Sequence, residues 1–247
     1  LGLDHDRAAE AYALEPDGAD VKRVLDMLAA RIARRVPAAY LMGRMWFAGL
    51  EFEVDDRVIV PRSPFAELIH ARFRPWIDPA GVRRILDIGT GSGCIAIACA
   101  VAFPSAVVDA VDVSPGALEV ARHNVERHSV GDRLRLLQGD VFEPVRGQRY
   151  DLVVSNPPYV SDDEMRALPP EYLREPDLAL RAGSDGLDIV RRILAGAREH
   201  LEPSGALFVE VGDSDERLQR AFPTLRCTWL EFEHGGGGVF MIRGSEL

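Results

Sequence analysis

Four consecutive residues, Asn156-Pro157-Pro158-Tyr159, have types and an order suited to one kind of chemistry. A planar amide or aromatic amine is a poor nucleophile because its lone pair is delocalised, and two acceptors on its N–H groups can push that lone pair out of the plane. The side-chain oxygen of Asn156 and the carbonyl of Pro157 can supply such acceptors. The prolines fix the loop, and Tyr159 offers a flat face to a planar group. We expect Asn156, Pro157 and Tyr159 to be catalytic, and all four residues to bind a planar, amide-like nitrogen.

A glycine-rich segment, Asp87-Ile88-Gly89-Thr90-Gly91-Ser92-Gly93, separates an apolar strand from an apolar helix. Glycines allow sharp turns and close approach of a ligand, and a helix N-terminus attracts a carboxylate such as that of a methionine moiety. Asp112 ends the next expected strand, where an acid accepts hydrogen bonds from ribose hydroxyls. A nicotinamide dinucleotide and S-adenosylmethionine fit these features equally well, because residues 91–96 also match G-x-G-x-x-A.

Four further features favour S-adenosylmethionine. The tight spacing of residues 87–93 and an antiparallel hairpin at the end of the chain resemble those of the seven-stranded methyltransferases. Gly139-Asp140-Val141 matches the position that holds adenine in that fold, and a hydride-transferring enzyme has no use for paired carbonyl acceptors at residues 156–157. The residues expected to bind the cofactor are Asp87, Gly89, Thr90, Gly91, Ser92, Gly93, Asp112, Val113, Asp140, Val141 and Asn156.

Strands and helices alternate over the larger part of the chain, which predicts a parallel, doubly wound sheet. The last two strands break this alternation and form the antiparallel hairpin. The fold class is therefore α/β: a seven-stranded, doubly wound, Rossmann-like sheet with a terminal hairpin. The expected strands are 85–88, 107–111, 134–137, 152–155, 206–211, 227–232 and 239–242, the expected helices are 94–102, one opened by residues 114–115, and 186–201, and residues 161–184 are expected to form a loop.

The first 40 residues are expected to be helical, because apolar side chains recur at positions 21, 24, 25, 28 and 32. Residues 45–60 have the pattern of short strands around turns. We predict three parts: 1–42 as a helical substrate-docking domain that allows for residues upstream of Leu1, 43–66 as a β-hairpin linker, and 67–247 as the methyltransferase domain.

The chain has 247 residues and a formal net charge of -10. An acidic surface repels phosphate backbones, so we expect a basic protein partner and no direct contact with nucleic acid. The longest apolar run, 94–103, is too short to cross a bilayer, and no signal peptide is visible. We therefore expect no membrane contact, a cytoplasmic location, and a monomer or weak dimer. No histidine–carboxylate cluster or CxxC motif indicates a metal.

Tyr40-Leu41-Met42-Gly43, Trp46-Phe47-Ala48-Gly49 and Val60-Pro61-Arg62 resemble the linker of the bacterial protein-(glutamine-N5) methyltransferases. The release-factor branch of that family typically continues with Pro-Glu-Thr, whereas this chain continues with Ser63-Pro64-Phe65. Together with residues 228–233, this departure resembles the branch that methylates ribosomal protein L-three of the large subunit.

The resemblance implies N(5)-methylation of a glutamine side chain in that basic ribosomal protein. It also implies S-adenosylmethionine as cofactor, with S-adenosylhomocysteine as product, and adds Arg62 to the substrate-binding residues. Methylation of release factors is the alternative. N6-adenine methylation of nucleic acid is a further alternative that the absence of a basic patch disfavours.

Overall fold

The computed structural model describes residues 15–233 and 235–247, so that residues 1–14 of the expected docking domain lie outside the described residues. Seven strands form one mixed sheet in the order β5-β4-β3-β6-β7-β9-β8. All neighbours are parallel except that β9 runs antiparallel to both β7 and β8, which confirms the predicted sheet and its terminal hairpin. The strands are β3 (Arg84–Ile88), β4 (Val107–Asp112), β5 (Leu134–Gln138), β6 (Tyr150–Ser155), β7 (Leu201–Glu210), β8 (Thr228–Trp229) and β9 (Val239–Arg243).

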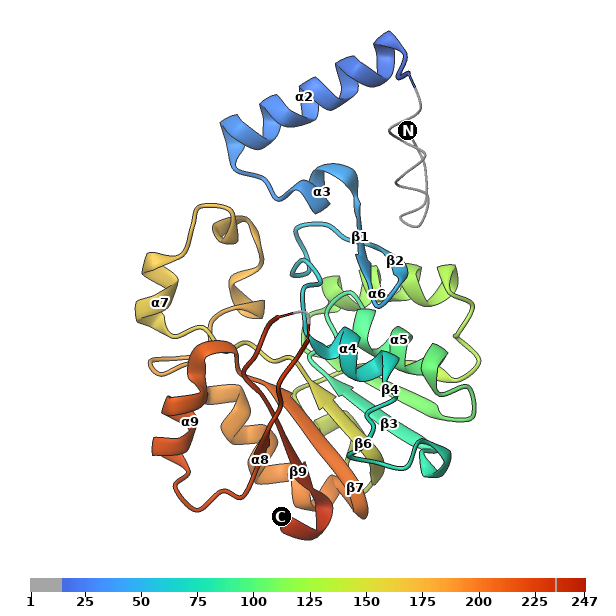
Figure 1. The fold of residues 1–247 in the computed structure, drawn as a ribbon, viewed down its shortest axis with the longest axis vertical. Helices are drawn as coiled ribbons and strands as arrows, with labels where there is room; N and C mark the ends of the chain where they lie inside the picture. Colours follow the sequence, from blue (N-terminus) through green and yellow to red (C-terminus); the bar gives the residue numbers. More distant parts are fainter. Residues whose placement is uncertain (1–14, 234) are drawn as a thin grey trace.

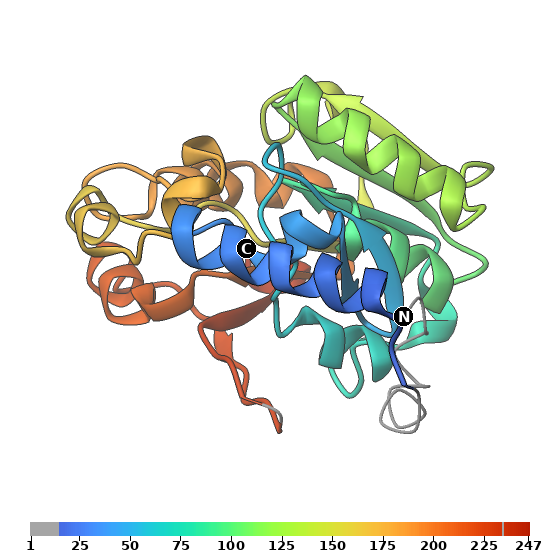
Figure 2. The same cartoon turned by 90° about the horizontal axis from the view of Figure 1, so that it is seen from above.

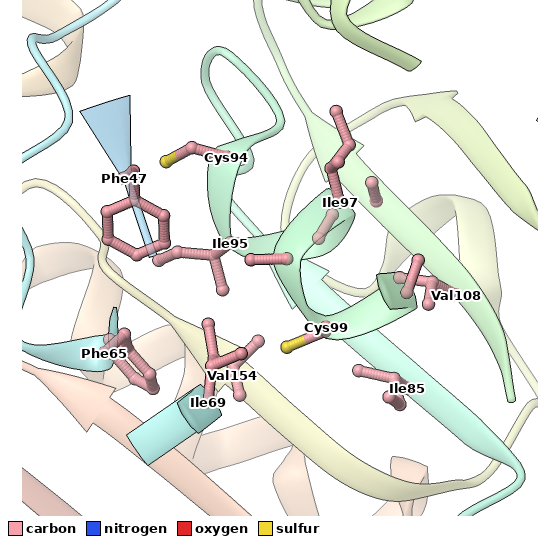
Figure 3. Packing of buried hydrophobic residues seen from close by; sticks show 14 of the residues in the cluster. Phe47, Phe65, Ile69, Ile85, Cys94, Ile95, Ile97, Cys99, Val108 and Val154 are labelled. Atoms are coloured by element: carbon pink, nitrogen blue, oxygen red, sulfur yellow. The ribbon is translucent and has the colours of Figure 1, made fainter. Parts of the chain in front are cut away.

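Helices cover both faces of this sheet (Figure 1). One face carries α4 (Phe65–His70), α5 (Cys94–Ala102) and α6 (Pro115–Arg127), and the other carries α8 (Asp188–His200) and α9 (Asp215–Ala221). Side chains alternate along each strand, so that neighbouring residues of β3 and β6 belong to different cores. Figure 3 shows the α5 side, where the buried thiols of Cys94 and Cys99 lie among aliphatic and aromatic side chains.

The N-terminal part contains α2 (Gly18–Arg34), α3 (Ala38–Met42) and a two-stranded antiparallel sheet of β1 (Arg44–Phe47) and β2 (Leu50–Glu53). Figures 1 and 2 show α2 crossing over the top of the molecule. The helical prediction for this region is confirmed from residue 18 but interrupted at residues 35–37, where Arg35 is left-handed and α3 begins after Pro37. The strand pattern expected to continue to residue 60 is wrong beyond β2.

The loop predicted for residues 161–184 contains α7 (Asp162–Ala167), η4 (Tyr172–Arg174) and η5 (Asp177–Ala179). The missed sequence signal is a capping box, in which Ser161 accepts from the backbone N–H of Glu164 and the Glu164 side chain accepts from that of Ser161. The remaining short helices are η2 (Pro79–Gly81), η3 (Glu143–Val145), η6 (Gly212–Ser214) and η7 (Gly244–Glu246). Among the helices of the described part, none has the length and apolar character to cross a bilayer.

Candidate active site

The sheet brings the expected functional segments to one edge. The strand order reverses at β3, which lies between β4 and β6, and ligands of such sheets bind outside the carboxyl ends of the strands at this point. The glycine loop follows β3, Asp112 ends β4, and Asn156 follows β6. Two adjoining pockets open there.

Backbone contacts to the end of β4 hold the glycine loop. The N–H groups of Gly89 and Thr90 donate to the carbonyl of Val111 at 2.8 and 3.0 Å, and the N–H of Gly91 donates to Asp112 Oδ2 at 2.8 Å. Gly89, Gly91 and Gly93 have φ values of 74°, 56° and 80°, which side-chain-bearing residues rarely adopt. The sequence of alternating glycines is therefore what lets this segment turn and remain close to β4.

The first of the two pockets, the glycine-loop pocket, contains seven of the eleven residues expected to bind a cofactor. They are Gly89, Gly91, Asp112, Val113, Asp140, Val141 and Asn156. The other four, Asp87, Thr90, Ser92 and Gly93, do not line it.

All four of those residues are buried, and Asp87, Thr90 and Ser92 make contacts that hold the loop in place. Asp87 is 1% exposed, and one of its carboxylate oxygens accepts from Thr90 Oγ1 at 2.6 Å and from the Ala96 N–H at 3.1 Å. Burial raises the pKa of Asp87 to about 7. The carbonyl of Ser92 accepts from the Asn124 side chain at 2.9 Å, which ties the loop to α6.

Two carboxyl groups line the glycine-loop pocket, and they differ in their partners: one accepts backbone N–H groups and the other pairs with an arginine. Each oxygen of Asp112 accepts one backbone N–H, from Gly91 and Ser114, and burial raises the pKa of this carboxyl group. A carboxylate oxygen accepts more than one hydrogen bond, so Asp112 retains capacity toward a ligand. Asp140, the expected adenine acceptor, forms an ion pair with Arg192 of α8 and is 44% exposed.

The sequence interpretation missed one wall of the glycine-loop pocket. Pro176, Leu178 and Ala179 line it, and they belong to the segment 161–184 that is predicted to be a loop. Glu175 anchors this segment: its buried carboxylate accepts from the Val60 N–H at 3.0 Å and from Arg62 Nη1 at 2.8 Å. Nothing in the Pro-rich, polar sequence of residues 169–181 indicates that this segment lies against the carboxyl ends of the strands.

The second pocket, the tyrosine pocket, lies on the other side of Asn156. Among the expected substrate-binding residues, Arg62, Asn156, Pro157 and Tyr159 line it, whereas Pro158 lines the glycine-loop pocket. The Arg62 guanidinium lies over the Tyr172 ring, 4.8 Å from its centroid. The remaining lining residues include Ile59, Val160, Glu164, Leu168, Ala179, Leu180, Glu210, Asp213, Ser214 and Arg217.

Asn156 is one of three residues that line both pockets, together with Ile59 and Ala179. A molecule in the glycine-loop pocket and another in the tyrosine pocket therefore meet at the Asn156 side chain. This arrangement suits the transfer of a group from one ligand to the other.

Glu210 is a residue of the tyrosine pocket that the sequence interpretation missed. Its carboxyl group accepts from Ser63 Oγ at 2.5 Å and from the Tyr159 hydroxyl at 3.2 Å. Burial raises the pKa of Glu210 to about 7, although both hydrogen bonds act in the opposite direction. The available signal was its position at the carboxyl end of the expected strand 206–211. The described residues contain no group of three or more His, Cys, Asp or Glu side chains arranged to hold a metal ion.

The sheet order, the glycine loop after β3 and the two adjoining pockets define a class I methyltransferase, and residues 75–181 match the family model described as "Methyltransferase small domain". Solved structures with this fold include the hMettl16 catalytic domain in complex with MAT2A 3'UTR hairpin 6 (TM-score 0.60, 16% identity, 91% of this chain and 81% of that chain). A methyltransferase from Pyrococcus furiosus is another (TM-score 0.56, 20% identity, 92% of this chain and 99% of that chain). These identities establish the fold alone.

Curated relatives give the family. "Ribosomal protein uL3 glutamine methyltransferase" of Bordetella pertussis is 50% identical over 91% of this chain and 76% of its own length. The proteins of the same name from Francisella tularensis (46%, 92% of this chain, 72% of its own length) and Bradyrhizobium diazoefficiens (48%, 96% of this chain, 80% of its own length) are similar. The chain is an enzyme and belongs to the ribosomal protein uL3 glutamine methyltransferase family.

Proposed function

We propose that this enzyme transfers the methyl group of S-adenosylmethionine to the side-chain amide nitrogen of a glutamine in ribosomal protein uL3. The names of relatives at 46–50% identity support the substrate. The observation that carries the chemistry is that Asn156 lines both pockets, so that it faces a methyl donor on one side and an acceptor nitrogen on the other.

The glycine-loop pocket fits S-adenosylmethionine, which would supply the methyl group. A Cβ added at Gly91 has no heavy atom within 4 Å, so the loop is open to a ligand at the point where it faces the pocket. In this proposal the loop backbone binds the methionine moiety, Asp112 accepts from the ribose hydroxyls, and Val113, Val141 and Leu178 enclose the adenine ring. Leu178 is 60% exposed in the chain alone, as expected of a side chain that a ligand covers.

The tyrosine pocket holds the glutamine amide in this proposal. Asn156 Oδ1 and the Pro157 carbonyl accept its two N–H groups, which localises the nitrogen lone pair and aims it across Asn156 into the neighbouring pocket. Preorganised dipoles of this kind act where charge develops, and alignment of the nitrogen adds a proximity contribution. Tyr159 packs against the amide plane. No strong base is needed: S-adenosylhomocysteine would leave as the methyl group moves, and the methylated nitrogen, positively charged and therefore acidic, would release one proton to solvent.

The substrate protein would be bound by the N-terminal helices and the 161–184 segment, which form one wall. Glu171 accepts from Arg31 at 3.0 Å and from Arg35 at 3.1 Å, so that α2 is tied to the segment that lines both pockets. Leu28 and Ile32 of α2 are 51% and 74% exposed and offer apolar surface on the same helix. A net charge of -10 suits a basic ribosomal protein. Such a substrate places the reaction in the cytoplasm.

The assay that tests the proposal uses the full chain, methyl-labelled S-adenosylmethionine and three separate acceptors: ribosomal protein uL3, a release factor and duplex DNA. We expect label in uL3, located on a glutamine by mass spectrometry, and a rate of labelling about 10²–10³-fold lower with the Asn156→Ala variant. Label only in the release factor would replace the proposed substrate, and label only in DNA would overturn the assignment to an amide nitrogen.

A further inference from the structure

Glu210 lies at the carboxyl end of β7 and connects two segments that are far apart in the sequence. One carboxyl oxygen accepts from the Tyr159 hydroxyl at 3.2 Å, and the other accepts from Ser63 Oγ at 2.5 Å. The side chains of Ser63 and Glu210 are buried, and a buried carboxyl group is costly unless its oxygens are satisfied. The two hydroxyl groups therefore belong to one hydrogen-bonded unit with Glu210 as its centre.

The backbone after Glu210 holds the rest of the Tyr159 ring. A Cβ added at Gly212 would lie 2.6 Å from Cε2 and 3.1 Å from Cζ of Tyr159, so the ring packs directly on the bare backbone at this position. The φ of Gly212 is 51°, which also favours glycine. At Gly186, an added Cβ would lie 2.3 Å from the Tyr159 carbonyl oxygen. The end of β7 thus contacts the ring at Cε2 and Cζ and also binds its hydroxyl group.

Ser63 is itself fixed from a second direction. Its Oγ accepts from the Phe65 N–H at 3.2 Å at the start of α4. The adjoining Pro64 lies against the glycine run of the terminal hairpin, where a Cβ added at Gly236 would be 3.2 Å from Pro64 Cβ. The position of Ser63 therefore depends on the linker and the hairpin. Through its hydrogen bond to Glu210, Ser63 affects where the Tyr159 ring lies.

We propose that Glu210 is a positioning residue, which holds the Tyr159 ring in register with the linker by accepting hydrogen bonds from Tyr159 and Ser63 at once. The proposal rests on the proposed function, in which Tyr159 forms a wall of the glutamine site. Glu210 acts through Tyr159, and Ser63 acts through Glu210. Loss of either hydrogen bond frees the ring to move away from the amide plane, which lowers kcat/KM for the protein substrate and leaves the cofactor affinity unchanged.

A double-mutant cycle between Ser63 and Glu210 tests this order of action. The variants are Ser63→Ala, Glu210→Ala, their combination, and Tyr159→Phe, which keeps the ring and removes its donor. We expect each single substitution to lower kcat/KM about tenfold, as for the loss of one buried hydrogen bond. Because Ser63 acts through Glu210, the combined variant should be no slower than Glu210→Ala alone.

Rescue by the conservative variant separates positioning from loss of packing. In Glu210→Gln the amide oxygen can accept from Tyr159 while its NH₂ group donates to Ser63, so we expect activity well above that of Glu210→Ala. The S-adenosylmethionine Kd, measured by calorimetry, should stay within twofold of the wild-type value in all variants. Unchanged cofactor binding also shows that each variant is folded.

Additive losses in the cycle, or equal activities of the alanine and glutamine variants, would overturn the positioning role. Failure of the proposed function gives a different result, because the unsubstituted enzyme would then transfer no methyl group to a glutamine of uL3.

Discussion

The two pockets that meet at Asn156 are built in different ways. One wall of the glycine-loop pocket is backbone: Gly89 and Gly91 have positive φ, and their N–H groups are bound to Val111 and Asp112. The tyrosine pocket is formed by residues from the linker, the loop after β6, the 161–184 segment, β7 and residues 213–217, and the Arg62–Glu175 and Ser63–Glu210 contacts join parts of it. A wall of backbone is suited to one constant cofactor, whereas a pocket without such a wall can be changed residue by residue to suit a substrate.

Asn156 belongs to both pockets, and its substitution should have the largest effect. Asn156→Ala removes an acceptor needed only for alignment of the nitrogen, so we expect kcat to fall by about 10²–10³-fold with little change in the cofactor Kd. Steady-state kinetics and calorimetry measure the two quantities. Asn156→Asp, which keeps an acceptor oxygen, is the matched control and should lose less. Weaker binding of the cofactor with an unchanged kcat at saturating cofactor would show that Asn156 serves the glycine-loop pocket alone.

Asp112 tests the glycine-loop pocket by itself. Asp112→Ala removes the acceptor for the ribose and for the Gly91 N–H, so we expect the S-adenosylmethionine Kd to rise about 10–100-fold. Turnover at saturating cofactor should change little. The cofactor Kd of Asp112→Asn should lie between those of the wild type and Asp112→Ala. The comparison of the pockets fails if the KM for uL3 rises in place of the cofactor Kd.

Each region contains one buried carboxyl group whose pKa is raised to about 7, Asp87 and Glu210. A folded-state pKa above the ordinary value means that the stabilising contribution is complete below about pH 4 and is lost as the pH rises through 7. Glu210→Gln cannot ionise. The unfolding free energy of wild type minus that of Glu210→Gln should therefore fall by about 3 kcal/mol between pH 4.5 and 8.

Denaturant unfolding at several pH values gives this difference, and Asp87→Asn is the matched variant from the other region. The unfolding free energy of wild type minus that of Asp87→Asn should also fall as the pH rises. Parallel stability curves for the wild type and Glu210→Gln would show that Glu210 does not titrate in this range.

The smallest expected effect distinguishes two glycines of one loop. Gly93→Ala places a Cβ 3.2 Å from Ile97 Cδ1 and 3.3 Å from Ala121 Cβ in addition to the cost of its φ of 80°, whereas Gly91→Ala bears the conformational cost alone. We expect losses of about 2 and about 1 kcal/mol in unfolding free energy. Thermal or denaturant unfolding measures them, and equal losses would mean that the packing of α5 on α6 adjusts freely at Gly93.

Sequence patterns predicted the parts of the fold that are determined locally. Continuous apolar strands and capped helices gave the sheet, and α5 has the predicted bounds 94–102, because a glycine loop and Pro104 flank it. The terminal hairpin is confirmed, although β8 covers only Thr228–Trp229 of the expected 227–232. The division into domains at residues 42 and 66 stays a prediction, as do the roles assigned to the site residues.

What the sequence could not give is contact between distant segments. The Ser63–Glu210 hydrogen bond joins residues 147 positions apart, and the Arg62–Glu175 pair joins residues 113 apart. Periodicity and motif spacing carry no information about such pairs, since they depend on how the linker and the 172–181 segment return to the edge of the sheet. The glycine-loop pocket was therefore predicted more completely than the tyrosine pocket.

The wall that the two pockets share has a thermodynamic consequence. Ile59, Asn156 and Ala179 face both pockets, so a ligand that shifts or stiffens them changes the free energy of binding in the other pocket. Such coupling is reciprocal: the factor by which the cofactor alters the affinity for the substrate equals the factor by which the substrate alters the affinity for the cofactor. Binding of uL3 can thus govern how long the methyl donor, and afterwards its demethylated product, stays on the enzyme.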